Sequence, residues 1–192
     1  MLASPNLPLL ALPLALLQST DLDRDPATGE RPNTLVALPS GAAGVRATLN
    51  ALVRLTKIYR STVPVRDLAE RIIAAVGEKD YTSEVVAVQT WVRDSVRYTR
   101  DVFDVETLKT PLETIRSLQG DCDDKALLAG TLLQSIGFKV RYVAVGYGEP
   151  DAYDHVYVET MLGNHWIAVE TTENVSLGWA PPNPHAKMIG NV

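Results

Sequence analysis

"LQGDCDDKALLAG" (residues 118–130) contains the only cysteine of the chain and leads from a glycine into an apolar, helix-forming run. Asp121 is a typical N-cap residue at the point where that run begins, and Gly137 supplies a stop beyond Ile136. The sequence therefore predicts a helix from Asp121 through Ile136 with a thiol in its first turn. Steps of three and four residues define an inward-facing stripe of Cys122, Ala126, Ala129, Leu133 and Ile136. Small residues on this helix should let it approach a sheet closely.

The electrostatic surroundings of this thiol act in two directions. Unpaired N–H groups and the positive end of the macrodipole at a helix N-terminus lower a thiol pKa and favour thiolate. The carboxylates of Asp121, Asp123 and Asp124 act against this. Rotation of about 100° per helical residue is expected to turn Asp123 and Asp124 away from Cys122, so that their effect is partial.

Helices are predicted to dominate the chain upstream of this stretch. Apolar periodicity predicts amphipathic helices over about residues 44–59, 65–77 and 83–96. The third should bury Val86, Val88, Trp91 and Val92. "VRYTRD" (residues 96–101) is typical of a strand that enters a loop. Thr110, Pro111 and Glu113 then form a capping box for a short helix that ends at Gly120.

Strand signals replace the helical period after Gly137. They cover residues 138–148, 155–162 and 165–172, and Gly163-Asn164 is a two-residue hairpin connection. If Leu162 pairs with His165, then Tyr157 stands opposite Glu170 and His155 opposite Thr172. Strand alternation places His155, Tyr157, Glu159 and Met161 on one face with Trp166, Ala168, Glu170 and Thr172. His155 and Glu170 become diagonal neighbours, about 7 to 8 Å apart at the backbone.

Cys122, His155 and Glu170 together make a set for acyl transfer. A thiol can attack a carbonyl carbon, an imidazole can hold its proton, and a carboxylate can orient the imidazole. The backbone N–H of Cys122 is one expected donor to the oxyanion of the tetrahedral intermediate, and the second donor stays open.

Three segments also resemble a known family: "WVRDSVRYTRD" (residues 91–101), "TPLETIRSLQGDCDDKALLAGTLLQSIGFKVRYVAVG" (residues 110–146) and "HVYVETMLGNHWIAVETT" (residues 155–172). They resemble the transglutaminase-like superfamily of papain-type cysteine enzymes, and most closely its small bacterial and tailed-phage members. "GWAPP" (residues 178–182) resembles the tail of those phage members. The resemblance implies an α+β fold over residues 43–192, in which helices precede an antiparallel sheet and the cysteine helix packs across it. By position it implies Cys122 as nucleophile, His155 as general base and Glu170 as the third residue, where the family pattern has Asp.

The remaining polar residues suggest no further site. The formal net charge is −5 and no basic block is present, so we expect no nucleic-acid partner. "DCDD" lacks the glycine and distal glutamate of an EF-hand, and the chain brings too few Cys and His residues for zinc, so we expect neither metal nor cofactor. His165 and His185 should have no catalytic role. Glu159 shares the face of His155, but it is expected to lie too far along the strand to orient it.

Residues 1–42 are interpreted as an apolar, Pro-rich arm and linker. The segment from Leu7 to Leu17 is apolar, Pro8 and Pro13 interrupt any helix, and no positively charged region precedes it. It is also shorter than the roughly 20 residues that span a bilayer. We therefore expect no membrane span and no typical signal peptide, with a virion or the cytoplasm of the producing cell as the location. An atypical signal peptide is the alternative.

Two functions from different classes follow. The first is a cysteine hydrolase or acyltransferase that cleaves amide bonds, with a cell-wall peptide as a plausible substrate and a place in a phage virion tail. The alternative is a non-enzymatic tail or baseplate component that keeps the fold and docks onto other tail proteins through residues 1–20. The sequence leaves open the substrate, the choice between hydrolysis and transamidation, and the oligomeric state.

Overall fold

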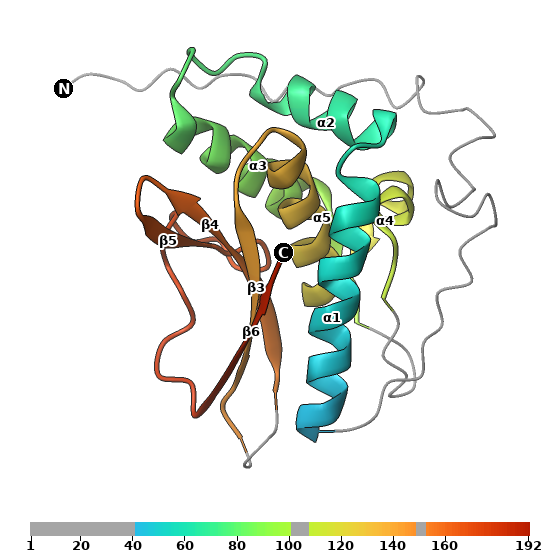
Figure 1. Cartoon of the computed structure of the whole chain (residues 1–192), viewed down its shortest axis with the longest axis vertical. Helices are drawn as coiled ribbons and strands as arrows, with labels where there is room; N and C mark the ends of the chain where they lie inside the picture. Colours follow the sequence, from blue (N-terminus) through green and yellow to red (C-terminus); the bar gives the residue numbers. More distant parts are fainter. Residues whose placement is uncertain (1–40, 101–107, 149–152) are drawn as a thin grey trace.

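A computed structural model describes residues 41–100, 108–148 and 153–192 (Figure 1). Residues 1–40 of the expected arm and linker (residues 1–42) lie outside this range, as do residues 101–107, where a loop was expected. The elements in chain order are α1 (Gly41–Tyr59), α2 (Val63–Ile73), α3 (Tyr81–Ser95), β1 (Arg97–Tyr98), α4 (Pro111–Ser117), β2 (Gln119–Gly120), α5 (Cys122–Ser135), β3 (Val140–Gly146), β4 (His155–Leu162), β5 (His165–Val169) and β6 (Ala186–Asn191).

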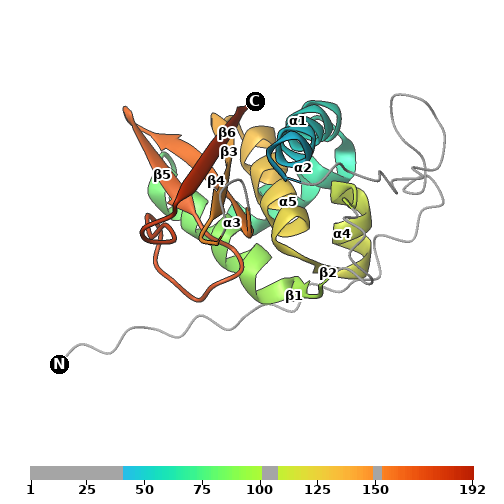
Figure 2. The ribbon, with the colours of Figure 1, turned by 90° about the horizontal axis from the view of Figure 1, so that it is seen from below.

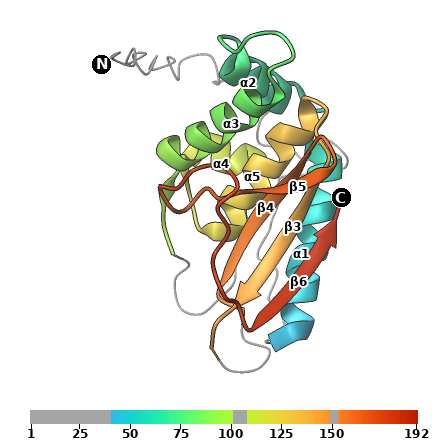
Figure 3. The ribbon, with the colours of Figure 1, turned by 90° about the vertical axis from the view of Figure 1, so that its left-hand side faces the viewer.

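The architecture is α+β, as predicted. β3 to β6 form an antiparallel sheet in the order β5-β4-β3-β6, and the helices gather on one face of it (Figure 3). β1 and β2 form a separate parallel pair that joins Tyr98 to Gly120. Seen from below, α5 lies between the sheet and helices α1, α2 and α4, and α3 lies beside it (Figure 2). None of the helices in the described ranges combines the length and apolar character that a bilayer crossing requires.

Helix α5 is the centre of the core, and its burial exceeds the expected stripe. Every side chain from Asp123 to Leu133 is buried, because the sheet covers one side and helices cover the others. The close approach that the small residues indicated occurs at Gly130, where a Cβ would collide with the hydroxyl group of Tyr142. That hydroxyl is in turn hydrogen-bonded to Thr56 of α1.

Each predicted helix is present, but some helix ends and one predicted buried residue differ from the prediction. In α3 the predicted burial of Val88 and Val92 is confirmed and that of Val86, which is 40% exposed, was wrong, because the stripe continues through Val85. The buried polar residue Gln89 belongs to that stripe and masked its period in the sequence. α2 ends at Ile73, before the glycine expected to stop it, and α1 begins at Gly41, inside the expected linker.

The capping box of α4 is confirmed. The Thr110 side chain accepts a hydrogen bond from the Glu113 N–H, and the Glu113 carboxylate accepts one from the Thr110 N–H. The helix stops at Ser117 rather than at Gly120, with Leu118 in the left-handed conformation at φ 50°. Gly120 is instead part of β2, where it pairs with Tyr98.

The β4–β5 hairpin has the predicted register, with Leu162 opposite His165 and Gly163 at φ 59° in the turn. The ladder ends at the pair Val158–Val169. The expected pairs Tyr157–Glu170 and His155–Thr172 therefore do not form, because the chain leaves the sheet at Glu170.

Strand β6 was not predicted. It pairs with β3 at the edge of the sheet away from β5 and lies beside α1 (Figure 3). A Cβ at Gly190 would lie 3.1 Å from Cβ of Leu49, so this glycine lets the strand approach the helix.

Candidate active site

The first turn of α5 presents Cys122 as the leading helical residue. Oδ1 of Asp121 accepts hydrogen bonds from the backbone N–H groups of Asp123 (3.1 Å) and Asp124 (3.2 Å), so Asp121 is the predicted N-cap. The N–H of Cys122 is the first of the helix and has no intrahelical carbonyl to bind.

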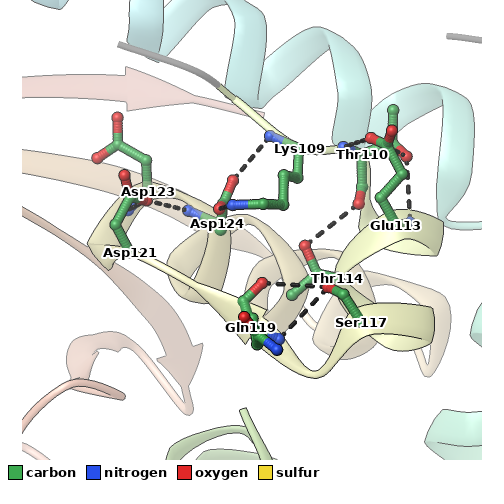
Figure 4. Close-up of polar contacts among 9 residues, drawn as sticks. All are labelled: Lys109, Thr110, Glu113, Thr114, Ser117, Gln119, Asp121, Asp123 and Asp124. Carbon is green, nitrogen blue, oxygen red and sulfur yellow. Dashed lines mark hydrogen bonds and ion pairs between the residues drawn. The ribbon is translucent and has the colours of Figure 1, made fainter. Parts of the chain in front are cut away.

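Asp124 fixes the loop before α4 to this turn (Figure 4). Its buried carboxylate accepts hydrogen bonds from the backbone N–H and the Nζ of Lys109, each at 2.7 Å. A Cβ at Gly120 would lie 2.5 Å from Cβ of Asp124, which explains the glycine before the Asp-Cys pair. Burial raises the pKa of the Asp124 carboxyl, and Lys109 acts in the opposite direction. As expected, Asp124 points away from the thiol.

Asp123 does not turn away from the thiol, and this expectation was wrong. The Cys122 Sγ lies 3.5 Å from Oδ1 of Asp123 in a hydrogen bond that the thiol donates. The side chains of Cys122 and Asp123 leave the helix in different directions. The Asp123 side chain nevertheless bends so that its carboxylate contacts the sulfur. Burial raises the pKa of the Cys122 thiol, and the charges of Asp123 and Asp121 raise it further. The resting group is therefore a neutral thiol, not the thiolate that the helix terminus alone would favour.

The sulfur also receives a hydrogen bond, from the backbone N–H of Val156 in β4. N–H groups alternate in direction along a strand. The N–H of Met161 bonds to Lys139 on the β3 side at 3.0 Å, so the N–H of Val156 points to the β5 side. The described ladder has no β5 residue opposite Val156, because it ends at Val158 and Val169. Cys122 thus completes the hydrogen bonding of the residue that follows His155.

His155 and Glu170 are in direct contact. Nε2 of His155 lies 2.7 Å from Oε2 of Glu170, while Oε1 accepts hydrogen bonds from the backbone N–H and the hydroxyl of Thr172, both at 2.6 Å. Burial alone would raise the pKa of the Glu170 carboxyl, but the hydrogen bonds from His155 and Thr172 outweigh it and hold the pKa below its ordinary value. An ionised carboxylate only accepts, so Nε2 carries a proton, and in the neutral form of the ring Nδ1 has the lone pair.

The other sequence candidates lie away from this site. Glu159 forms an ion pair with Arg141, with Oε2 at 2.6 Å from Nε, on the outer face of the sheet. His165 is exposed in the hairpin, and His185 is exposed just before β6. Among the residues in the described ranges, no three His, Cys, Asp or Glu side chains are grouped so that they could hold a metal ion.

Two residues near the thiol escaped the sequence analysis. Tyr98 is 46% exposed and pairs with Gly120, two residues before Cys122. Partial burial raises the pKa of the Tyr98 phenol; a thiolate at Cys122 would raise it further, as does the charge of Asp121. Lys125 is buried and donates hydrogen bonds to the carbonyls of Arg93 (3.1 Å) and Val96 (2.7 Å) at the end of α3. The tyrosine stood in a recognised strand signal, whereas nothing in the sequence marked the lysine.

A comparison with protein families identifies the family of the chain. The model of the transglutaminase-like superfamily matches residues 66–171, more than half of the chain. Among curated protein sequences, none matches significantly.

Solved structures share the fold at low sequence identity. A candidate cysteine protease from Cytophaga hutchinsonii aligns with a TM-score of 0.51 and 21% identity over 72% of this chain and 47% of its own. A candidate protease from Parabacteroides distasonis gives a TM-score of 0.51 and 14% identity over 73% of this chain and 31% of its own. Calcium-bound LapG from Legionella pneumophila gives 0.50 and 16% over 73% of this chain and 83% of its own. The chain thus spans less than half the length of the first two proteins.

Proposed function

Because the chain belongs to the transglutaminase-like superfamily, we propose that it is a cysteine hydrolase that cleaves amide bonds through a thioester on Cys122. The observation that carries the proposal is the contact of the Cys122 sulfur with the N–H of Val156, directly after His155, whose Nε2 is held by Glu170. This arrangement joins a thiol, a base and an orienting carboxylate from α5, β4 and the end of β5.

The proposed reaction starts from the neutral thiol. Sγ of Cys122 attacks the carbonyl carbon of the amide while its proton passes to Nδ1 of His155. His155 gives that proton to the leaving nitrogen as the C–N bond breaks, which leaves a thioester. Water then attacks the thioester, His155 takes its proton, and rupture of the C–S bond restores the thiol and releases a carboxylic acid. Glu170 stabilises the imidazolium in both steps.

The oxyanion of each tetrahedral intermediate needs donors in fixed positions. The N–H of Cys122 is one, since no helical carbonyl binds it. We propose the phenol of Tyr98 as the second, because its proximity to the thiol and its partial exposure suit a group that meets the substrate.

The substrate class is proposed as a peptide. The likeness to candidate proteases supports this choice, and the sequence resemblance to phage members favours a cell-wall peptide as target. Hydrolysis is preferred to transamidation because water is always available as the acceptor.

We also propose that residues 1–20 attach the protein to a virion tail. The same attachment is expected if the protein is a non-enzymatic tail component. Removal of residues 1–20 separates the two ideas: lost assembly with intact chemistry supports docking by the arm.

The decisive experiment is to trap the thioester. The protein is mixed with a library of peptide anilides, quenched in acid and weighed as the intact chain. The parent should carry an acyl group that hydroxylamine removes, and Cys122→Ser should not acquire a hydroxylamine-sensitive adduct. His155→Ala should acylate at least about a hundredfold more slowly, since it lacks the general base. Absence of any adduct on the folded parent, or equal acylation of His155→Ala, would contradict the proposal.

A further inference from the structure

Glu170, the proposed third residue beside Cys122 and His155, has a flexible side chain. It has three rotatable bonds and ends in a buried carboxylate. Fixing such a side chain costs conformational entropy, so neighbours must define where the carboxylate stops. Its side chain is 1% exposed, and both oxygens have partners. The surroundings of Glu170 therefore decide whether Oε2 faces His155.

Thr172 holds the carboxylate itself. Its backbone N–H and its Oγ1 both donate to Oε1 of Glu170 at 2.6 Å, two residues away in the chain. Two donors on one oxygen fix the rotation of the carboxylate plane and leave Oε2 directed at Nε2 of His155.

Gln89 of α3 holds the backbone from which Glu170 projects. Its Nε2 donates to the carbonyl of Glu170 at 2.9 Å and lies 3.4 Å from the carbonyl of Val175. Gln89 is only 2% exposed, so these bonds have little competition from water. A single amide thus joins two points of the loop that follows β5, five residues apart.

We propose that Thr172 and Gln89 are positioning residues for the His155–Glu170 pair. Thr172 orients the carboxylate, and Gln89 fixes the point where the chain leaves the sheet. The inference rests on the proposed function for its catalytic consequence, but the contact that it explains can be measured without turnover.

The test compares Thr172→Val, which keeps the shape and removes the hydroxyl, with Thr172→Ser, which keeps it. The first readout is the downfield proton resonance of His155 Nε2–H, which is observed when a carboxylate holds that proton. We expect Thr172→Val to weaken or abolish this resonance and Thr172→Ser to retain it. Thr160→Val is the matched control, because the Thr160 hydroxyl donates to the carbonyl of Lys139 at 3.1 Å, at the far end of β4.

The second readout is the rate of Cys122 acylation. A hydrogen bond to a charged group is lost, so Thr172→Val should acylate about tenfold to a hundredfold more slowly. In the Glu170→Gln background the same substitution should have almost no further effect, since the two residues act as one unit.

Gln89→Met should likewise weaken the His155 resonance, whereas Gln134→Met should not. Gln134 also bonds through its amide, to Arg60 at 2.9 Å, but lies near the far end of α5.

A structural role alone would lower the melting temperature and leave the His155 resonance intact. That result in Thr172→Val, or in Thr172→Ala if the valine variant does not fold, overturns the inference. If the parent forms no thioester, the proposed function fails, while the resonance still decides whether Thr172 and Gln89 position the pair.

Discussion

Replacement of Asp123 by Asn should make the thiol more reactive, although it removes a residue next to the candidate nucleophile. The Asp123 carboxylate accepts a hydrogen bond from the neutral thiol and opposes its ionisation. Asn has nearly the same shape, carries no charge, and can donate a hydrogen bond to sulfur. The substitution should therefore increase the thiolate fraction at neutral pH.

The size of the effect follows from the 3.5 Å separation of Sγ and Oδ1. Two unit charges at that distance repel by about 1 kcal/mol in a water-like medium and by about 5 kcal/mol at an effective dielectric constant of 20. Cys122 is partly exposed, so screening favours the lower end. About 1 to 2 kcal/mol gives roughly sixfold to thirtyfold more thiolate. A less basic thiolate is a weaker nucleophile, which reduces the gain to about threefold to sixfold in rate.

The assay is alkylation by iodoacetamide between pH 6 and 9, followed by intact mass. The chain has a single cysteine, so one adduct reports on one site. Asp67→Asn is the control, because it removes the same charge from an exposed position on α2. If Asp123→Asn reacts no faster than the parent while its circular dichroism is unchanged, the carboxylate does not restrain the thiol and the reasoning fails.

Three further predictions concern the same site. The lowered pKa of Glu170 means that its stabilising effect is present above its unfolded pKa of about 4.3 and is lost as pH falls through the lower folded value. The melting temperature of the parent should therefore fall more steeply between pH 5 and 3 than that of Glu170→Gln, and parallel curves would contradict this. Tyr98→Phe should slow acylation by about tenfold or more if the phenol binds the oxyanion; an unchanged acylation rate would remove Tyr98 from that role, and thermal melts check that the fold is intact. Gly120→Ala should destabilise the fold by about 1 to 3 kcal/mol in urea unfolding, because the new Cβ meets Asp124, and a neutral result would mean that the turn adjusts freely.

Local chemistry made much of the fold predictable. The Thr110–Glu113 capping box, the Asp121 cap and the Gly163-Asn164 turn each satisfy backbone groups within a few residues, so their signals are present in short stretches. The hairpin register followed from the turn alone, and it correctly brought His155 and Glu170 to the same region.

Features that depend on distant segments were not predictable in this way. β6 exists because β3 and α1 offer an edge and a surface for it, and its own sequence alternates only weakly. Val85 was not recognised in the buried stripe of α3 because Gln89, which is buried by partners in the loop after β5, interrupts the apolar pattern. The state of the thiol depends on its burial and on a side-chain rotation of Asp123, and no periodicity encodes that rotation.

The bond between the Val156 N–H and the Cys122 sulfur has a dynamic consequence. The sulfur lies on the side of β4 that a strand would cover if β5 continued, so the candidate nucleophile also completes the hydrogen bonding at that end of β4. A thioester sulfur is a poorer acceptor than a thiol or a thiolate. Formation of the acyl-enzyme should therefore loosen the backbone beside His155, and hydrolysis should tighten it again. On the proposed mechanism, the Cys122 sulfur would couple the chemical step to a local opening of the sheet.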